Sequence, residues 1–392
     1  MELPLKSPPQ VGDVFRDLSE PFRKHYRMSP RQMKVFYALQ NCRTAIMGGH
    51  IDKCNECGHI RIFYNSCRDR HCPKCQGIKT ARWVDKLASD LLPVSYFHVV
   101  FTIPAQLNPL VLNNPRCLYN ILFKATSQTI LSLGKDPRFL GGLTGMIAVL
   151  HTWGQNLMLH PHLHCIIPAG AWNEDRAKWN PSSKKFFLPV RVISRLFKAK
   201  FLAFLKDEHA SNSLLLNGKG GYLDSSTNFK SLINSLYEKP WIVYCKKPFK
   251  NTGHIITYLG RYSHRVAITN QRLLNADHNQ VTFRIKDYKD HNRIKSLSLQ
   301  PAEFIHRFLL HVLPDGFCKI RYYGLFACRN KPTILIHCKT VIGHSLTKSK
   351  LAGLNWMQML WILTGWNLSV CPVCQKGSMI YAGELNTLRA PP

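Results

Sequence analysis

Two Cys-x2-Cys pairs lie close together near the start of this chain, in the stretch CNECGHIRIFYNSCRDRHCPKCQ. Cys54 and Cys57 form the first pair, Cys72 and Cys75 the second, and 14 residues separate them. Structural zinc takes four thiolate or imidazole ligands in a tetrahedron, and each pair supplies two thiolates from one tight turn. The spacing therefore predicts one structural Zn²⁺ site made of these four cysteines, which folds the segment around the metal.

Other residues of the same stretch extend this prediction. Cys67 and His71 lie between the two pairs, so either could replace one ligand or belong to a second site. The basic side chains of Arg68, Arg70 and Lys74 stand beside the cysteines and are expected to bind a nucleic-acid backbone.

A third pair, Cys371-Pro-Val-Cys374, stands near the end of the chain without a fourth pair nearby. Cys338, His337 or His344 could complete a second zinc site with it. The chain opens with the polar, proline-rich MELPLKSPPQ and shows no secretory signal. Its 14 cysteines are therefore interpreted as thiols of a cytoplasmic protein and as metal ligands rather than as disulfides.

The charge of the chain points to a polyanionic partner. Lys and Arg number 53 against 22 Asp and Glu, a formal net charge of +31. Nucleic acid is the first expectation and a membrane surface the weaker one. Two uncharged stretches, residues 91–115 and 351–375, carry prolines or polar residues. The second is expected to be a buried or partner-facing helix, so we expect no membrane partner.

Strand-like and helix-like segments alternate from about residue 95 onward. Strands are predicted at 95–105, 144–153, 159–172, 241–247, 265–288 and 319–327, and helices at 117–133, 190–206 and 301–313. The strands at 144–153 and 159–172 are expected to form a hairpin. The alternation predicts an α+β fold, a mostly antiparallel sheet flanked by helices, preceded by the small Cys-rich zinc-binding domain.

The stretch HPHLHCIIPAG places His160, His162 and His164 at alternate positions ahead of an apolar run. In a strand these imidazoles share one face, and His162 and His164 are close enough to bind one divalent cation. A third ligand is expected from the other arm of the hairpin. His151 is the first choice and the neutral amide of Gln155 the alternative. His160 stays open as a residue that supports the ligands, and a structural role for all the histidines competes with the metal site.

Two tyrosines follow in NTGHIITYLGRYSHRVAITN. Tyr258 and Tyr262 are four apart and would share one face of a helix, with Arg261, His264 and Arg265 beside the second of them. Packing of an aromatic pair is the simpler interpretation. A nearby cation and a metal-bound phosphate would instead favour attack by a tyrosine phenolate, and Arg261 and Arg265 would then bind DNA.

These motifs resemble those of the rolling-circle nucleases named HUH after their His-hydrophobic-His strand. The set CRDRHCPKC, HTWGQNLMLHPHLHC and YLGRYSHRVAITN is similar to the two-tyrosine transposases of the insertion sequence 91 family, over roughly Met47 to Ala327. The resemblance implies an HUH nuclease core in which Phe101–Pro104 is the first nuclease strand. It also implies that His162 and His164 ligate a catalytic Mg²⁺ or Mn²⁺ and that Tyr258 and Tyr262 are nucleophiles.

The implied function is transposition. The resemblance implies an endonuclease and strand transferase that cuts and rejoins single-stranded DNA at transposon ends and in target DNA through a 5′-phosphotyrosine. No G-x-x-x-x-G-K-[ST] loop is present, which argues against a fused helicase. The general base and the oligomeric state stay open.

Three other functions remain in competition. A zinc-containing DNA-binding regulator would use the same basic surface without catalysis. A plasmid replication initiator or relaxase would share the HUH chemistry on another substrate, and an acidic-triad transposase would leave no phosphotyrosine.

Four regions follow from these motifs. They are a basic helical lead-in at 1–47, a zinc-binding domain with a helical linker at 48–94, the nuclease core at 95–275, and a C-terminal α+β region at 276–392. A bacterial, nucleoid-associated location in the cytoplasm is expected.

Overall fold

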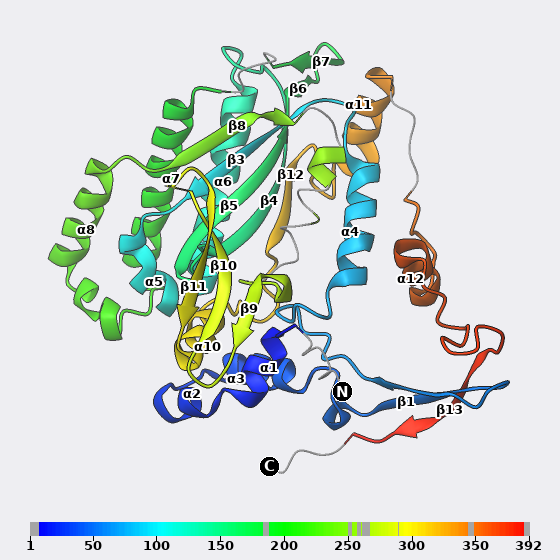
Figure 1. The fold of residues 1–392 in the computed structure, drawn as a ribbon. Coiled ribbons are helices and arrows are strands. Elements are labelled where there is room, and N and C mark those ends of the chain that lie inside the picture. Colours follow the sequence, from blue (N-terminus) through cyan, green and yellow to red (C-terminus); the bar gives the residue numbers. More distant parts are fainter. Residues whose placement is uncertain are drawn as a thin grey trace.

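A five-stranded antiparallel sheet lies at the centre of the chain (Figure 1). The computed structural model describes residues 8–182, 188–249, 253–256, 260, 267–288, 290–343 and 349–387. The strands are β3 (Tyr96–Thr102), β4 (Gly145–Trp153), β5 (Leu159–Pro168), β8 (Val243–Phe249) and β12 (Ile320–Gly324). Their order is β12-β4-β5-β3-β8, so the β4–β5 hairpin lies within the sheet.

Four helices cover one face of this sheet. They are α5 (Asn108–Asn113), α6 (Pro115–Lys135), α7 (Val190–Ala210) and α8 (Ser226–Glu238). Alternate residues of β3, among them Phe97 and Phe101, point into this layer and pack in one core with Phe197 and Phe201 of α7. The apolar residues on this face of β5 include Leu163, as the period of two requires.

The opposite face carries the histidines and is covered by other elements. The helices are α4 (Gly77–Asp90) and α11 (Ile336–Val341), on the far side of the sheet from α5 to α8 in Figure 1. Tyr96, Ile147 and Ile166 of the sheet pack here in one core with Leu87 of α4 and with Ile255. The helical turn at 253–256 therefore lies on the histidine-bearing face.

The N-terminal helices pack against elements from the later part of the chain. α1 (Val11–Asp17), α2 (Glu20–His25) and α3 (Pro30–Asn41) share a core with a three-stranded sheet and the helix that follows it. These later elements are β9 (Leu273–Ala276), β10 (Val281–Asp287), β11 (Arg293–Leu299) and α10 (Pro301–Leu309). The ring of Phe15 lies 5.3 Å from that of Phe308, centroid to centroid. The predicted lead-in of residues 1–47 thus packs in one unit with the start of the predicted C-terminal region.

The two ends of the chain also meet in a second three-stranded sheet. β1 (Gly49–Cys54) lies between β2 (Ile60–Tyr64) and β13 (Met379–Leu385), and Figure 1 shows the blue β1 beside the red β13. The short helix α12 (Trp356–Thr364) precedes β13, and β6 (Gly170–Asn173) pairs with β7 (Lys178–Pro181). None of the helices in the described residues is both long and apolar enough to span a membrane.

The predicted α+β class is confirmed, with three differences in detail. β11 was not predicted. Its sequence, RIKSLSL, is mostly polar because most of the strand is exposed, so it lacks the run of apolar residues that marks a buried strand. β12 belongs to the central sheet although it lies outside the predicted core region of 95–275. α12 is not a buried helix, since Trp361 is 60% exposed and Met359 is the only buried residue of the helix, so of the two expected roles the partner-facing one remains.

Candidate functional site

Three histidines from the β4–β5 hairpin meet on one face of the central sheet. His151 is the direct cross-strand partner of His162, and His164 follows two residues later on β5. A nitrogen of each ring lies within 4.8 Å of those of the other two, and the Nε2 atoms of His162 and His164 are 3.0 Å apart. The period of two along β5 and the antiparallel register therefore bring three imidazoles to one point.

Hydrogen bonds on the outer nitrogens orient two of these rings. The Nδ1 of His162 lies 2.6 Å from the carbonyl oxygen of His160 and must donate to it. The Nδ1 of His164 lies 2.8 Å from Nε2 of His98 on β3. Both rings thus turn Nε2 toward the shared space, which is how proteins orient histidines that bind metals.

Burial keeps these rings neutral. It lowers the pKa of His162 to about 4 and the pKa of His98 to about 3. The pKa of His164 is also held well below its ordinary value, first by burial and then by the neighbouring His151. A neutral imidazole has the lone pair that a metal needs, so His162 and His164 have the right protonation state at neutral pH.

The structure distinguishes the two candidates for a third ligand. His151 is the one beside His162 and His164. Gln155 lies in the turn after β4, where its side chain is directed to β10: Nε2 donates to the hydroxyl of Tyr288 at 3.3 Å and Oε1 accepts from the backbone N–H of Lys286 at 3.4 Å.

Four predicted site residues, Tyr258, Tyr262, Arg261 and Arg265, lie outside the described residues. The chain on either side of them is described. Ile255 is fully buried on the histidine-bearing face. A Cβ added to Gly260 would lie 3.2 Å from Cγ2 of Val84 on α4, so Gly260 sits against that helix.

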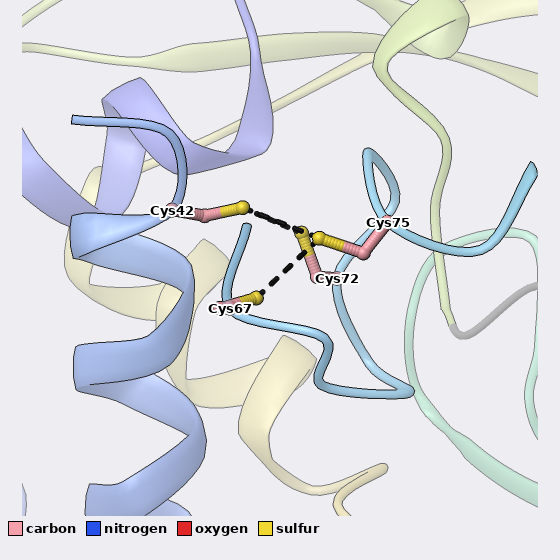
Figure 2. A group of neighbouring side chains, drawn as sticks. All are labelled: Cys42, Cys67, Cys72 and Cys75. Carbon is pink, nitrogen blue, oxygen red and sulfur yellow. Dashed lines mark hydrogen bonds between the residues drawn. The ribbon is translucent and has the colours of Figure 1, made fainter. Parts of the chain in front are cut away.

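The cysteines form two clusters rather than the single predicted one. Figure 2 shows the first, in which Cys42 after α3 joins Cys67, Cys72 and Cys75 with their sulfurs directed toward one another. The Sγ of Cys75 lies 3.3 Å from that of Cys42 and 3.6 Å from that of Cys67. A tetrahedral zinc with bonds of about 2.3 Å separates its sulfurs by about 3.8 Å, so the four residues fit this ion.

The second cluster joins Cys54 and Cys57 to Cys371 and Cys374 from the other end of the chain. The prediction that Cys54, Cys57, Cys72 and Cys75 share one zinc was therefore wrong. Each of the two pairs lies beside cysteines from other parts of the chain and not beside the other pair. Cys338, one of the three residues that could have completed a site with the last pair, is instead buried in the core beside the central sheet, and His344, another of them, lies outside the described residues.

His71 is not a ligand but a structural residue. Its buried ring donates from Nδ1 to the carboxylate of Asp69 at 2.7 Å and accepts at Nε2 from the backbone N–H of Leu313 at 3.2 Å. Both ring nitrogens are therefore committed to the protein, and Cys67 is the residue of the loop that joins the zinc cluster.

Of the three predicted DNA-binding side chains beside the cysteines, one is also structural. The guanidinium of Arg70 donates to the carbonyl oxygens of Phe317 at 2.5 Å and Pro314 at 3.0 Å, so it holds the loop before β12. Arg68 is exposed and Lys74 half-buried. Nothing in the sequence distinguishes the structural Arg70 from Arg68 and Lys74.

Two residues of the site were missed in the sequence. Cys42 stands alone, and its one signal is that three Cys-x2-Cys pairs together with Cys42 and Cys67 make eight ligands, enough for two zinc ions. His98 lies in an apolar strand, and its position two residues before Val100, the partner of His164, emerges only from the register of β3 on β5.

Comparison with protein families gives two matches. Residues 145–332 match a family model described as "Putative transposase", and residues 14–103 match one described as "Transposase zinc-binding domain". The first range contains the three histidines. The second contains Cys42 and the five cysteines from Cys54 to Cys75, but not the C-terminal pair.

Curated relatives agree with these models. The chain is 41% identical over 390 residues to a protein of Sinorhizobium fredii named "Putative transposase y4qJ", covering 99% of this chain and 98% of that one. It is 28% identical over 292 residues to the transposase for insertion sequence element IS801 of Pseudomonas savastanoi pv. phaseolicola, covering 74% of this chain and 68% of the relative. No solved structure matches the chain.

Proposed function

This chain belongs to the insertion sequence 91 family of transposases, and we propose that it cuts and rejoins single-stranded DNA at the ends of its element in rolling-circle transposition. A transposase acts on DNA as an endonuclease and strand transferase. The group of His151, His162 and His164 is the observation that carries the finer proposal, because it offers three imidazole donors at one point on one face of the sheet.

These three histidines would hold the catalytic metal ion. Imidazole donors favour Mn²⁺ over Mg²⁺, which prefers oxygen ligands, although phosphate oxygens of the DNA would add such ligands. When bound, the ion would polarise the scissile phosphate as a Lewis acid. His98 and the carbonyl of His160 keep two of the rings in position for it.

Tyr258 and Tyr262 are the proposed nucleophiles. The tyrosine oxygen bonds to phosphorus, its proton passes to a base, the bond from phosphorus to the 3′ oxygen breaks, and the leaving 3′ oxygen takes up a proton. The products are a 5′-phosphotyrosine and a free 3′ hydroxyl, and attack by a 3′ hydroxyl on the phosphotyrosine reverses these steps. The phosphodiester energy is conserved in the protein–DNA bond, so rejoining needs no ATP.

Chain length supports this assignment. Tyr258 is three residues from Ile255, so their Cα atoms are at most about 11 Å apart, and Ile255 is buried on the histidine-bearing face. Tyr262 follows Gly260, which sits against α4 on that face, by two residues. Ile255 and Gly260, the described residues next to the two tyrosines, therefore lie on the side of the sheet where the histidines meet, which supports the proposed roles.

The charge of the chain supports a DNA substrate. A formal net charge of +31 favours binding of a polyanion. Arg261 and Arg265 are proposed to bind the DNA near the tyrosines, and the exposed Arg68 to bind it at the zinc cluster.

A covalent adduct tests the proposal. Purified protein is incubated with single-stranded oligonucleotides from the element ends and Mn²⁺, and the products are separated on a denaturing gel. We expect a protein–DNA adduct that is absent with Tyr258→Phe/Tyr262→Phe and strongly reduced with His164→Ala. His160→Ala is the matched control, because it keeps the backbone carbonyl and should retain adduct formation.

Two results would contradict the proposal. An adduct that persists in the double tyrosine variant would refute the assignment of the nucleophiles. Binding of the end DNA without any adduct in the wild type would favour a DNA-binding regulator.

A further inference from the structure

We propose that Cys54, Cys57, Cys371 and Cys374 form a second structural zinc site, which fastens the C-terminal part of the chain to the N-terminal hairpin. The matched zinc-binding family model ends at residue 103 and contains only half of these ligands. The proposal does not depend on the DNA-cutting mechanism, because it concerns only the cysteines.

The sulfurs have the spacing of a tetrahedral thiolate site. The Sγ of Cys54 lies 3.7 Å from that of Cys374, and the Sγ of Cys57 lies 3.7 Å from that of Cys371. All four lie within 4.8 Å of one another. Zinc–sulfur bonds of about 2.3 Å require about 3.8 Å between sulfurs, whereas a disulfide would require about 2.05 Å.

Both pairs form the tight turn that presents two thiolates to one ion. The backbone N–H of Gly58 donates to the carbonyl of Cys54 at 3.2 Å, and that of Gln375 to the carbonyl of Cys371 at 3.0 Å. Gly58 and Gln375, each directly after its second cysteine, have φ values of +72° and +56°. The two turns are therefore built alike, although Cys371 follows Cys57 by 314 positions in the sequence.

Further contacts stabilise the second turn. The N–H of Gly377 donates to the sulfur of Cys374 at 3.3 Å, a contact that is stronger to a thiolate than to a thiol. A thiolate is the form that binds zinc. The N–H···S bond and the metal thus favour the same state of the cysteine.

Backbone pairing brings the two turns together. Asn55 donates its N–H to the carbonyl of Ser378 at 3.1 Å and accepts the N–H of Ser378 on its side-chain oxygen at 2.8 Å. Cys54 is the cross-strand partner of Met379 in the β1–β13 ladder. A metal at this point would close a loop of more than 300 residues, which removes much conformational freedom from the unfolded chain.

The site leaves no room for a side chain at one position. A Cβ on Gly377 would lie 2.4 Å from the sulfur of Cys54. Gly377→Ala should therefore displace a ligand and weaken the second site alone. Gly77→Ala is the matched control, because a Cβ on Gly77 has no neighbour within 4 Å.

Zinc content measures the proposal directly. Full-length protein purified with reductant should contain two zinc ions per chain by atomic emission. Cys371→Ser/Cys374→Ser should contain one, and Cys328→Ser, which changes an exposed cysteine outside both clusters, should retain two. One zinc in the wild type, or two in the double variant, would overturn the assignment.

A second measurement covers the case in which the double variant fails to fold. A mercurial reagent added stepwise to the wild type should release two zinc ions as it consumes the eight clustered thiols. Gly377→Ala should release one of the two more readily, while Gly77→Ala releases zinc as the wild type does. If Gly377→Ala matches the wild type, or if mass spectrometry finds a Cys54–Cys374 disulfide in the reduced preparation, the cysteines do not hold zinc in this way.

Discussion

Removal of the His98 side chain should weaken metal binding although it removes none of the proposed ligands. His98 is 3% exposed, and its Nε2 lies 2.8 Å from Nδ1 of His164. Burial lowers the pKa of His98 to about 3, so at neutral pH it is a neutral group that can accept this hydrogen bond. The proton on Nδ1 leaves Nε2 of His164 with a lone pair for the metal.

The expected magnitude follows from the type of contact. Loss of a hydrogen-bond partner behind a metal-binding histidine typically costs 10- to 100-fold in metal affinity. This corresponds to about 1.4 to 2.8 kcal/mol. His98→Ala should therefore raise the Mn²⁺ concentration for half-maximal adduct formation by this factor, and His98→Gln, which keeps an acceptor, should recover part of the loss.

Three measurements separate this role from simple destabilisation. Titration with Mn²⁺ gives the midpoint of adduct formation, calorimetry gives Mn²⁺ affinity without DNA, and thermal melting gives stability. His160→Ala should leave both Mn²⁺ values unchanged, since its backbone carbonyl makes the contact to His162. A folded His98→Ala variant with the wild-type Mn²⁺ midpoint would refute the reasoning.

Three further predictions concern stability. Gly324 has a left-handed backbone, φ +59°, which costs an alanine roughly 1–2 kcal/mol. Gly324→Ala should destabilise the protein by more than this, because the new Cβ would lie 1.9 Å from the carbonyl oxygen of Thr144. Gly343→Ala, also at positive φ but with open space around it, should show the backbone cost alone in chemical denaturation. Burial lowers the pKa of His311 to about 4, below its ordinary value near 6.5. Its contribution of about 3 kcal/mol to the free energy of unfolding is therefore complete above pH 6.5 and is lost as the pH falls toward 4. If the stability of His311→Gln depended on pH as strongly as that of the wild type, this reasoning would be contradicted. Cys42→Ser should remove one zinc ion and lower the melting temperature, and an unchanged zinc content would show that Cys42 is not a ligand.

Local patterns predicted the parts of the site that depend on neighbours in sequence. The period of two along 159–168 placed His162 and His164 on one face, and the hairpin predicted His151 opposite them, as the register of β4 on β5 shows. Each Cys-x2-Cys pair was recognised as a turn that presents two thiolates. These features follow from backbone geometry over a few residues, which sequence alone specifies.

What the sequence left undecided is which distant groups meet. Cys54 and Cys57 join Cys371 and Cys374 rather than the pair 14 residues away, because β1 pairs with β13 and carries the first turn to the second. Cys42 reaches its zinc cluster from the end of α3, and His98 reaches His164 across the β3–β5 ladder. In the sequence His71 resembles a metal ligand and Arg70 a DNA-binding residue. In the structure both side chains form hydrogen bonds to the backbone of the loop at 313–317. A spacing of ligands fixes the shape of each half of a site, whereas the choice of the other half depends on the packing of the whole chain.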